Sequence, residues 1–270
     1  MNKLQFKLLD AFSFFHDVCV ENGLRYYSSG GTMLGAVRHH GFIPWDDDVD
    51  VWMPRMDYEK LIRIMKSKKK GKYCFETPAS NTGRHYYPMG KLYDTTTTAV
   101  EKTKFNVRKG IYIDVFPMDG LGKTEAERNR NFRKIHFWHM LLASRVSVPR
   151  KERSAWKNTA IRLSSVIPEA VFNTEKAIRW FDRQCTKISY DESNYVGILM
   201  GSYGMRDIVP KDWLGDPVLY DFETIKVYGV KNYDKYLTYI FGDWRKLPPK
   251  EKRVSLHDFE LLDFRHGYLE

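Results

Sequence analysis

The stretch WDDDVDVWM, residues 45–53, constrains the fold more than any other part of the chain. It places four carboxylates within five positions, at Asp46, Asp47, Asp48 and Asp50. The alternation is typical of a β-strand, in which residues two apart share a face, and it predicts that Asp48 and Asp50 point the same way. The opposite face, which we expect to enter a core, carries Val49, Val51 and Met53. Because close carboxylates repel one another and strand interiors disfavour aspartate, something must compensate this charge.

A further strand carboxylate, Asp114, lies far along the chain in GIYIDVFPMDG. Its strand is predicted to have one apolar face of Ile111, Ile113 and Val115, and an opposite face of Tyr112, Asp114 and Phe116. If the two strands pair, Asp48, Asp50 and Asp114 form a triad of hard oxygen ligands, which suit Mg²⁺ or Mn²⁺. We predict these three as catalytic and metal-binding residues, with Asp46 available as a further ligand.

Other polar residues have simpler interpretations. Asp47 is explained equally well as a turn former or a solvated charge, and Asp119, in PMDG, is predicted to be a turn residue rather than a catalytic one. His136 and His139 lie one helical turn apart but lack nearby carboxylate or cysteine ligands, so we expect core or surface histidines. The aromatic run HFWHM around them is expected to pack within its helix.

The segment SSGGTMLGAVRHH, residues 28–40, predicts a phosphate-binding turn. Small residues end a strand and open a helix, so that backbone N–H groups and the positive helix end point outward together. The predicted binding residues of the turn are Ser29, Gly30, Gly31 and Thr32. The candidate phosphate clamps are Arg38, His39, His40 and Lys91. A glycine pair alone is common in turns, so the prediction depends on the acidic motif that follows it.

Hydrophobic spacing predicts an α+β protein in three parts. Residues 1–120 form a mixed β-sheet core flanked by helices, beginning with an amphipathic helix that ends at Gly23. Residues 121–210 form a mostly helical insert, with long helices over 124–146 and 173–189 separated by the basic linker PRKERS. Residues 211–270 form a mixed segment that we expect to pack back on the core and complete the acceptor side.

Composition limits the class and location of the protein. The 43% hydrophobic content is enough for a core, and three scattered cysteines without CxxC spacing argue against a disulfide framework or a thiolate zinc site. No apolar run approaches the ~20 residues that span a bilayer, so we expect a cytoplasmic protein. The formal net charge of +10 favours polyanionic partners, although a generally basic soluble surface explains it as well.

Strand, glycine pair, helix, the DVDVW motif and a third strand aspartate together resemble the nucleotidyltransferase superfamily, with its DNA polymerase β-like fold. The longer string GGTMLGAVRHHGFIPWDDDVDVWMPRMDYEKL resembles more narrowly the LicD family of phosphocholine transferases, relatives of fukutin-type proteins. IYIDVFPMDG and YDKYLTYIFGDWRKLPPKEKR, followed by His257, add to this resemblance. It covers most of the chain, and residues 121–210 are the least recognisable part. The gap from Gly31 to Asp48 is longer than is usual in the superfamily.

The resemblance implies Mg²⁺-dependent transfer of phosphocholine from CDP-choline to a sugar hydroxyl, with release of CMP. The acceptor would be a polyprenyl-linked precursor of teichoic acid or lipopolysaccharide. Asp48 and Asp50 would hold the ion at the diphosphate, the Gly30–Gly31 turn and Arg38 would cradle it, and Asp114 would bind metal or act as general base. Choline, a quaternary ammonium, is usually held by aromatic faces. Trp45 is the first candidate, although a structural role explains it equally well; the others are Trp52, Tyr86, Tyr87, Trp213 and Trp244.

Three alternatives stay open at this point. The same acids would serve a nucleotidyltransferase that adds NMP from an NTP to a small molecule, or the transfer of phosphoethanolamine or ribitol phosphate. A nucleic-acid-binding module would use the charge without chemistry, but no RRM, KH or helix-turn-helix signature is present, so no nucleic acid is expected. Surplus Lys and Arg and the stretch IHFWHMLLASRV are compatible with peripheral contact with anionic inner-leaflet lipid, but core packing is the favoured explanation of that helix.

Overall fold

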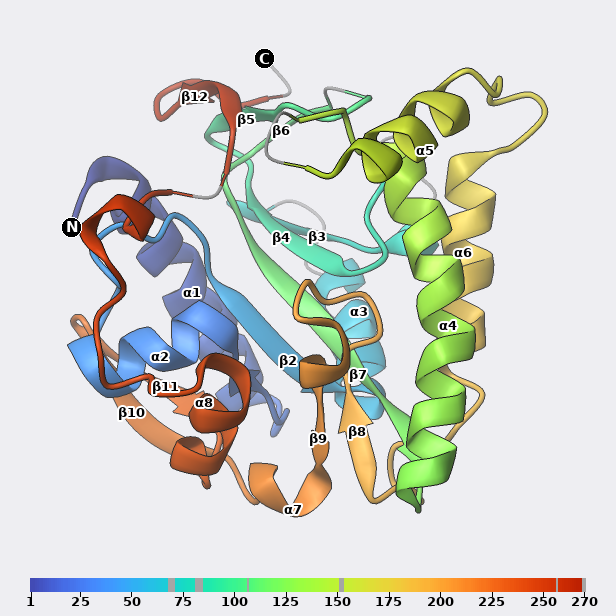
Figure 1. The fold of residues 1–270 in the computed structure, drawn as a ribbon. Coiled ribbons are helices and arrows are strands. Elements are labelled where there is room, and N and C mark those ends of the chain that lie inside the picture. Colours follow the sequence, from blue (N-terminus) through green and yellow to red (C-terminus); the bar gives the residue numbers. More distant parts are fainter. Residues whose placement is uncertain (68–70, 81–84, 106, 151–152, 256, 269–270) are drawn as a thin grey trace.

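A computed structural model describes residues 1–67, 71–80, 85–105, 107–150, 153–255 and 257–268. Figure 1 shows a central sheet with helices on both sides. The strand order is β1-β2-β7-β4-β3, with β8 paired to β7 and β9 paired to β8. These strands are β1 (Tyr27–Ser28), β2 (Asp50–Pro54), β3 (Tyr73–Glu76), β4 (Gly90–Asp94), β7 (Tyr112–Gly122), β8 (Tyr195–Gly197) and β9 (Ile208–Pro210).

The two acidic strands lie side by side, which is the condition that the predicted triad depends on. β2 pairs in parallel with β7, with Asp50 opposite Asp114. On its other side, β7 pairs antiparallel with β4, which places Lys91 opposite Asp114. The strand that we expected from residue 48 begins instead at Asp50, so Asp48 lies in the approach to the strand. The N–H of Asp114 still donates to the carbonyl of Val49 (2.9 Å), which continues the strand contact one residue further.

One face of the sheet packs against helices α1 (Lys3–Glu21) and α3 (Arg55–Ser67). Val51, Ile113 and Val115 all enter this core, so the predicted alternation of apolar and acidic residues is confirmed. Asp50 and Asp114 therefore lie on the other face. There Trp52 and Phe116 enter a second core beneath α4 (Glu125–Val146), α6 (Thr174–Cys185) and α8 (Tyr233–Phe241). The register thus brings Asp50 and Asp114 together at the edge of this second core.

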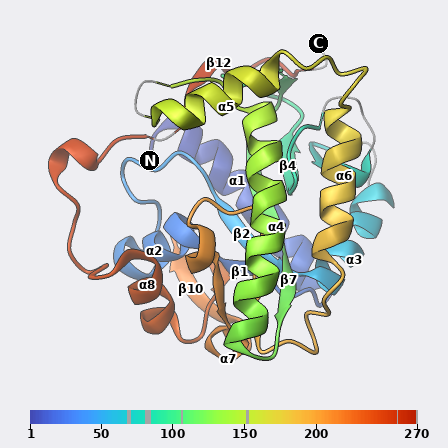
Figure 2. The same ribbon diagram turned by 45° about the vertical axis from the view of Figure 1, so that its right-hand side comes forward.

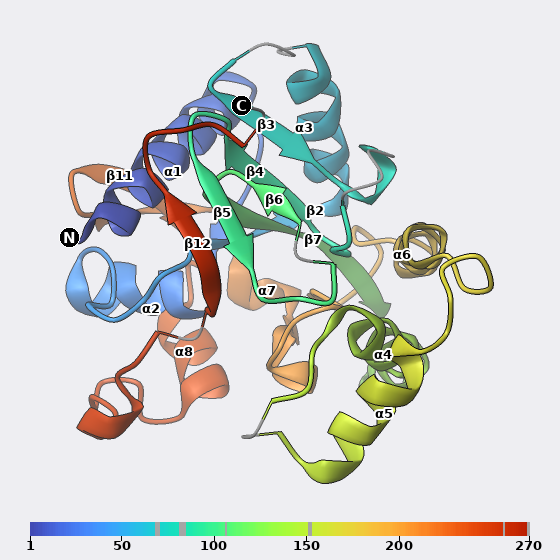
Figure 3. The same cartoon turned by 90° about the horizontal axis from the view of Figure 1, so that it is seen from above.

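The C-terminal segment returns to the N-terminal module. β12 (Phe259–Asp263) pairs with β5 (Thr98–Glu101), which pairs with β6 (Arg108–Lys109); Figure 3 shows these three strands lying side by side. The remaining elements are α2 (Gly30–His39), η1 (Pro78–Ser80), α5 (Ala155–Ser165), η2 (Gly204–Asp207), α7 (Lys211–Leu214), β10 (Val218–Phe222), β11 (Ile225–Gly229) and η3 (Lys250–Lys252). Among the described helices, none has the length and apolar character that crossing a membrane requires.

The prediction that Asp119 is a turn residue is wrong. The PMDG sequence lies inside β7, and Asp119 is paired with Gly197 of β8. Its buried carboxylate accepts two hydrogen bonds from Arg55, at 2.7 and 2.6 Å. The strand can continue through an aspartate here because a buried guanidinium neutralises it.

The long helices predicted in the insert are present as α4 and α6, although α6 ends at Cys185 and α5 was not expected. The predicted linker PRKERS lies partly outside the described residues, at 151 and 152. His136 stacks on Phe132 and His139 contacts Phe181, as the packing interpretation predicts. Phe137 and Trp138 contradict it, because they are 64% and 38% exposed. Consecutive helical residues point in different directions, so only part of the aromatic run can face the core.

Candidate active site

Burial and mutual repulsion dominate the electrostatics of the acid cluster. Burial, then the charge of Asp48, raises the pKa of Asp46 to about 8. Burial also raises the pKa of Asp50 well above its usual range, with added repulsion from Asp48, Asp114 and Asp46. The pKa of Asp48 is raised mainly by burial. Such a cluster is destabilised when all its carboxylates are ionised, and a proton or a cation must offset their charge.

Lys91 supplies part of this compensation from within the protein. It is 2% exposed, and its Nζ lies 2.8 Å from Asp114 Oδ1 and 3.9 Å from Glu101 Oε1. The ammonium also lies 3.4 Å from the centre of the Tyr112 ring. Burial raises the pKa of Asp114, and the charge of Lys91 opposes this rise. The residue that we predicted as a phosphate clamp is thus placed as a buried counter-ion of Asp114.

The start of α2 positions the acids. Ser29 is the N-cap, and the N–H of Gly30, in the left-handed region at φ 48°, donates to the hydroxyl of Tyr236 (2.9 Å). A Cβ at Gly31 would lie 2.7 Å from Asp46 Oδ2, so glycine here leaves room for that carboxylate. The hydroxyl of Thr32 accepts a hydrogen bond from the N–H of Asp50 (2.9 Å). The predicted turn therefore holds Asp46 and Asp50 in place, and its first amide is already bonded.

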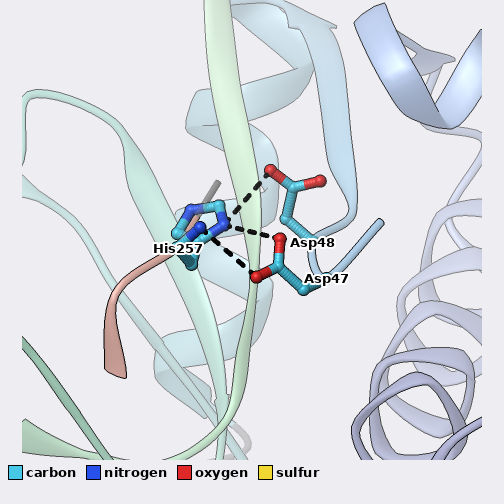
Figure 4. A group of neighbouring side chains, drawn as sticks. All are labelled: Asp47, Asp48 and His257. Carbon is cyan, nitrogen blue, oxygen red and sulfur yellow. Dashed lines mark hydrogen bonds and ion pairs between the residues drawn. The ribbon is translucent and has the colours of Figure 1, made fainter. Parts of the chain in front are cut away.

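Asp47 joins the site to the C-terminal segment. Figure 4 shows its carboxylate facing His257, whose backbone N–H lies 3.3 Å and Nδ1 3.0 Å from its two oxygens. The hydroxyl of Ser255 also donates to Asp47. Burial disfavours protonation of His257, but its hydrogen bond to Asp47 and the charge of Asp48 outweigh this and raise its pKa to about 9. The solvated-charge and simple-turn interpretations of Asp47 are both incomplete, because Asp47 anchors a segment more than two hundred residues away.

Among the described residues, one group of possible metal ligands has atoms that all lie within 4.8 Å of one another: Asp47, Asp48 and His257. Of the predicted triad, only Asp48 belongs to this group. Asp50 and Asp114 lie opposite each other in β2 and β7, outside it. His257 was not predicted as a site residue, and its only signal was its position after YDKYLTYIFGDWRKLPPKEKR.

A cavity of about 530 Å³ adjoins the acids. Its wall includes Gly31 and Asp46 from the site, the predicted Arg38 and Trp45, and the aromatic side chains of Tyr203, Phe241 and Trp244. Arg38 donates to the carbonyl of Trp244 (2.7 Å) and to the ring of His39 (3.0 Å), so these two of the four predicted clamps lie at this wall or beside it.

Tyr203, in the wall of the cavity, is also close enough to the acids to interact with their charge. Burial and the charge of Asp50 together raise the pKa of Tyr203. The other aromatic candidates lie in different surroundings. Trp52 is buried in the core, Tyr86 stacks on Phe105, Tyr87 covers Lys91 and Trp213 contacts Tyr239.

Acidic residues on paired strands, beside a helix that opens on a glycine pair and within a mixed sheet flanked by helices, define a nucleotidyltransferase-like α+β protein. The sequence model described as LicD/FKTN/FKRP, nucleotidyltransferase domain, matches residues 23–151. The chain is 26% identical over 260 residues to the lipopolysaccharide cholinephosphotransferase LicD of Haemophilus influenzae, covering 95% of this chain and 96% of that protein. It is 42% identical to an uncharacterised protein of Rickettsia prowazekii, over 40% of this chain and 48% of that protein. The LicD family model therefore matches just under half of the chain, and the similarity to the Haemophilus influenzae protein extends over nearly all of it.

Proposed function

We propose that this phosphotransferase moves phosphocholine from CDP-choline to a sugar hydroxyl of a polyprenyl-linked teichoic acid or lipopolysaccharide precursor. The observation that carries the proposal is the aromatic cavity whose wall includes Gly31 and Asp46 of the acid cluster. Its volume of about 530 Å³ falls within the range of roughly 300–1,000 Å³ that is typical of small-molecule sites. The name of the relative from Haemophilus influenzae supports a choline-phosphate donor and a lipopolysaccharide acceptor.

The donor set of the site fits a hard divalent cation. Its ligands are carboxylate oxygens, and burial, with the charges of neighbouring carboxylates, raises the pKa values of Asp46, Asp48 and Asp50. Asp48, Asp50 and Asp114 would hold Mg²⁺ or Mn²⁺, with Asp46 next to them. When bound, the ion would neutralise negative charge on the donor diphosphate.

The residues of the chain then have distinct parts in the reaction. The acceptor oxygen forms a bond to the phosphorus that carries choline, the bond from that phosphorus to the CMP oxygen breaks, and CMP leaves. Asp114 would take up the hydroxyl proton, and Lys91, 2.8 Å away, favours its ionised form before the transfer. Thr32 fixes the backbone of Asp50 through its 2.9 Å hydrogen bond. Positioning of this kind accounts for most of the catalysis in phosphoryl transfer.

The cavity has the chemistry that the two ends of the donor need. Trp45, Tyr203 and Trp244 offer aromatic faces to a quaternary ammonium, which cannot donate hydrogen bonds. Arg38, Lys246 and Lys252 line the same cavity and offer positive charge to phosphate oxygens. Because the acceptor is lipid-linked, the enzyme would work at the inner face of the cytoplasmic membrane.

The decisive experiment is incubation with CDP-choline, Mg²⁺ and a glycan-precursor extract, followed by analysis of CMP and of the modified glycan. We expect CMP release that EDTA abolishes. Asp48→Asn and Asp50→Asn should each reduce transfer by more than about a hundredfold, because each loses a charged ligand. Asp221→Asn, on the exposed β10–β11 hairpin, is the matched control and should retain full activity.

Three outcomes would contradict the proposal. Substantial transfer by Asp48→Asn or Asp50→Asn would remove the metal assignment. Release of diphosphate from an NTP, without CMP from CDP-choline, would indicate a nucleotidyltransferase. Turnover of a CDP-ethanolamine or CDP-ribitol donor in preference to CDP-choline would assign a different phospho-alcohol.

A further inference from the structure

The outer surface of helices α4, α5 and α6 is rich in exposed apolar side chains. Figure 2 shows the three helices together on one side of the molecule. Of the nineteen large apolar side chains that are exposed among the described residues, ten lie between residues 137 and 180. We refer to these ten as the helical face: Phe137, Trp138, Met140, Leu141, Trp156, Leu163, Val166, Ile167, Val171 and Trp180. Apolar surface concentrated in this way marks an interaction site.

The helical face is hollowed as well as apolar. A cavity of about 490 Å³ lies between α4 and α5, with Phe137 and Trp156 in its wall. A second cavity of about 270 Å³ lies between α4 and α6, with Trp138 and Trp180 in its wall. The two tryptophan rings contact each other edge to face, with centroids 5.1 Å apart. Leu141 lines both cavities, so the two hollows and the ridge between them form one continuous surface.

The positive charge of the protein is concentrated in the same region. Residues 123–187 contain fifteen Lys and Arg and six Asp and Glu, so this segment carries a net +9 of the formal +10 of the whole chain. Four of the acids form ion pairs within the protein: Asp182 with Arg55 (2.9 Å), Glu169 with Arg145 (2.8 Å), Glu175 with Arg179 (3.7 Å) and Glu125 with Arg128 (3.9 Å). The exposed basic residues of the segment are Lys123, Arg130, Arg133, Lys134, Arg150, Lys157, Arg162, Lys176, Arg183 and Lys187.

Basic and aromatic side chains share the same helix stripes. On α4, Arg133 precedes Phe137 by four residues and Lys134 precedes Trp138 by four; on α6, Lys176 precedes Trp180 by four. Residues four apart on a helix are neighbours on its surface. A long basic side chain can therefore reach an anionic headgroup while the aromatic ring next to it enters the apolar boundary, where Trp is favoured.

We infer that the helical face docks on an anionic lipid bilayer. The apolar side chains enter the boundary between headgroups and acyl chains, and the exposed Lys and Arg bind the anionic headgroups. A second copy of this chain fits the surface poorly, because it would bring one +9 segment against another. A nucleic acid would engage the charges but would leave aliphatic side chains such as Leu163 and Val171 exposed to water.

The inference concerns a surface outside the acid cluster, and it stands without the proposed reaction. If that reaction is correct, the helical face has a direct consequence for it. A polyprenyl-linked acceptor is held in the same bilayer, so docking would raise its local concentration at the enzyme.

Vesicle flotation of the full chain, without nucleotide or acceptor, tests the inference. We expect binding to vesicles of phosphatidylcholine with phosphatidylglycerol, at least about tenfold weaker binding to phosphatidylcholine alone, and weakening with salt. Phe137→Ser with Leu163→Ser should reduce binding to the mixed vesicles by about tenfold or more, since two apolar side chains no longer enter the lipid. The matched control is Phe6→Ser with Leu219→Ser, an exposed Phe and Leu outside the helical face, and it should bind as the parent does.

A charge-reversed variant tests the contribution of the exposed basic residues. Arg133→Glu with Lys134→Glu should weaken binding to the mixed vesicles, and its circular dichroism should stay that of the parent because both side chains are exposed. Three results would overturn the inference. The first is an equal loss of vesicle binding in the Phe6→Ser, Leu219→Ser control, and the second is unchanged vesicle binding of the Phe137→Ser, Leu163→Ser variant. The third is RNA binding that depends on Arg133 and Lys134, without any binding to vesicles. Dimerisation that the Phe137→Ser, Leu163→Ser variant abolishes, without vesicle binding, would assign the surface to a second copy. Phosphocholine transfer to a water-soluble saccharide is measured separately, so failure of the reaction leaves the docking result intact.

Discussion

Replacing Arg55 by methionine is expected to destabilise the fold by about 3–5 kcal/mol, the cost of leaving one partner of a buried ion pair uncompensated. Arg55 is 7% exposed and Asp119 1%. The guanidinium donates to both oxygens of Asp119, at 2.7 and 2.6 Å, and to Asp182 at 2.9 Å. Methionine fills much of the same space but leaves the Asp119 carboxylate in the core without its cation. Because domains are stable by only roughly 5–15 kcal/mol, the loss should be easy to measure.

The measurement is urea unfolding followed by circular dichroism, across a range of pH. Burial raises the pKa of Asp119, and the charge of Arg55 opposes this rise. In Arg55→Met the folded-state pKa of Asp119 therefore increases further, so the protonated carboxyl is favoured in the fold and the deficit should shrink as pH falls. Lys226→Met, which removes an exposed ion pair with Asp221, is the control and should leave stability nearly unchanged.

A double variant tests whether the effect belongs to the pair. Asp119→Leu added to Arg55→Met removes the uncompensated carboxylate, so most of the lost stability should return. The reasoning is refuted if Arg55→Met costs no more than Lys226→Met, or if the double variant is less stable than Arg55→Met alone. A folded Asp119→Leu, Arg55→Met protein that had lost transfer entirely would point instead to a catalytic role of Asp119.

Three further predictions concern the site. His257 has a folded pKa of about 9 against an ordinary value of 6.5. Its ion pair with Asp47 should therefore stabilise the fold fully below about pH 6.5, and this stability should be lost as pH rises through about 9. His257→Gln should flatten this part of the profile of melting temperature against pH. Asp46 has a folded pKa of about 8 against an ordinary value of 3.8, so the stability of the fold, measured in the presence of EDTA, should fall as pH rises between these values. Asp46→Asn should remove that fall, and an unchanged profile of stability against pH would contradict the burial of the acid. Gly31→Ala would place its Cβ 2.7 Å from Asp46 Oδ2 and displace the carboxylate, so transfer should drop by about tenfold or more while unfolding free energy changes by less than about 1 kcal/mol; normal turnover would show that the position of Asp46 is unimportant.

The alternation in WDDDVDVWM and GIYIDVF was enough to predict which residues of the two strands enter the core, whereas the pairing of the strands was only assumed. This works because a buried face imposes its period of two on the sequence of each strand. The helices α1, α4 and α6 were accessible for a similar reason, since their apolar residues recur at helical spacing. The glycine pair was also a sound signal, although its structural use is to make room for Asp46 as well as to open a helix.

Charge compensation was not accessible in this way. Three acids are neutralised by a residue at least 23 positions away in the sequence: Lys91, Arg55 and His257 are these partners. No local sequence pattern predicts a partner at such a distance. The expectation that HFWHM packs inside its helix failed at Phe137 and Trp138 for a related reason. Spacing shows that a helix has an apolar stripe, but which of several apolar stripes faces the core depends on how the helix is set against the sheet.

The sequence by itself determined the acidic strands, the glycine-opened helix and the similarity to the LicD family, because each depends on residues close together along the chain. Only the tertiary structure decided which cation offsets which carboxylate, that Asp119 is structural, and that the C-terminal segment is tied to Asp47. Ion pairing depends on distance in space and on burial, and both are set by the packing of segments far apart in sequence.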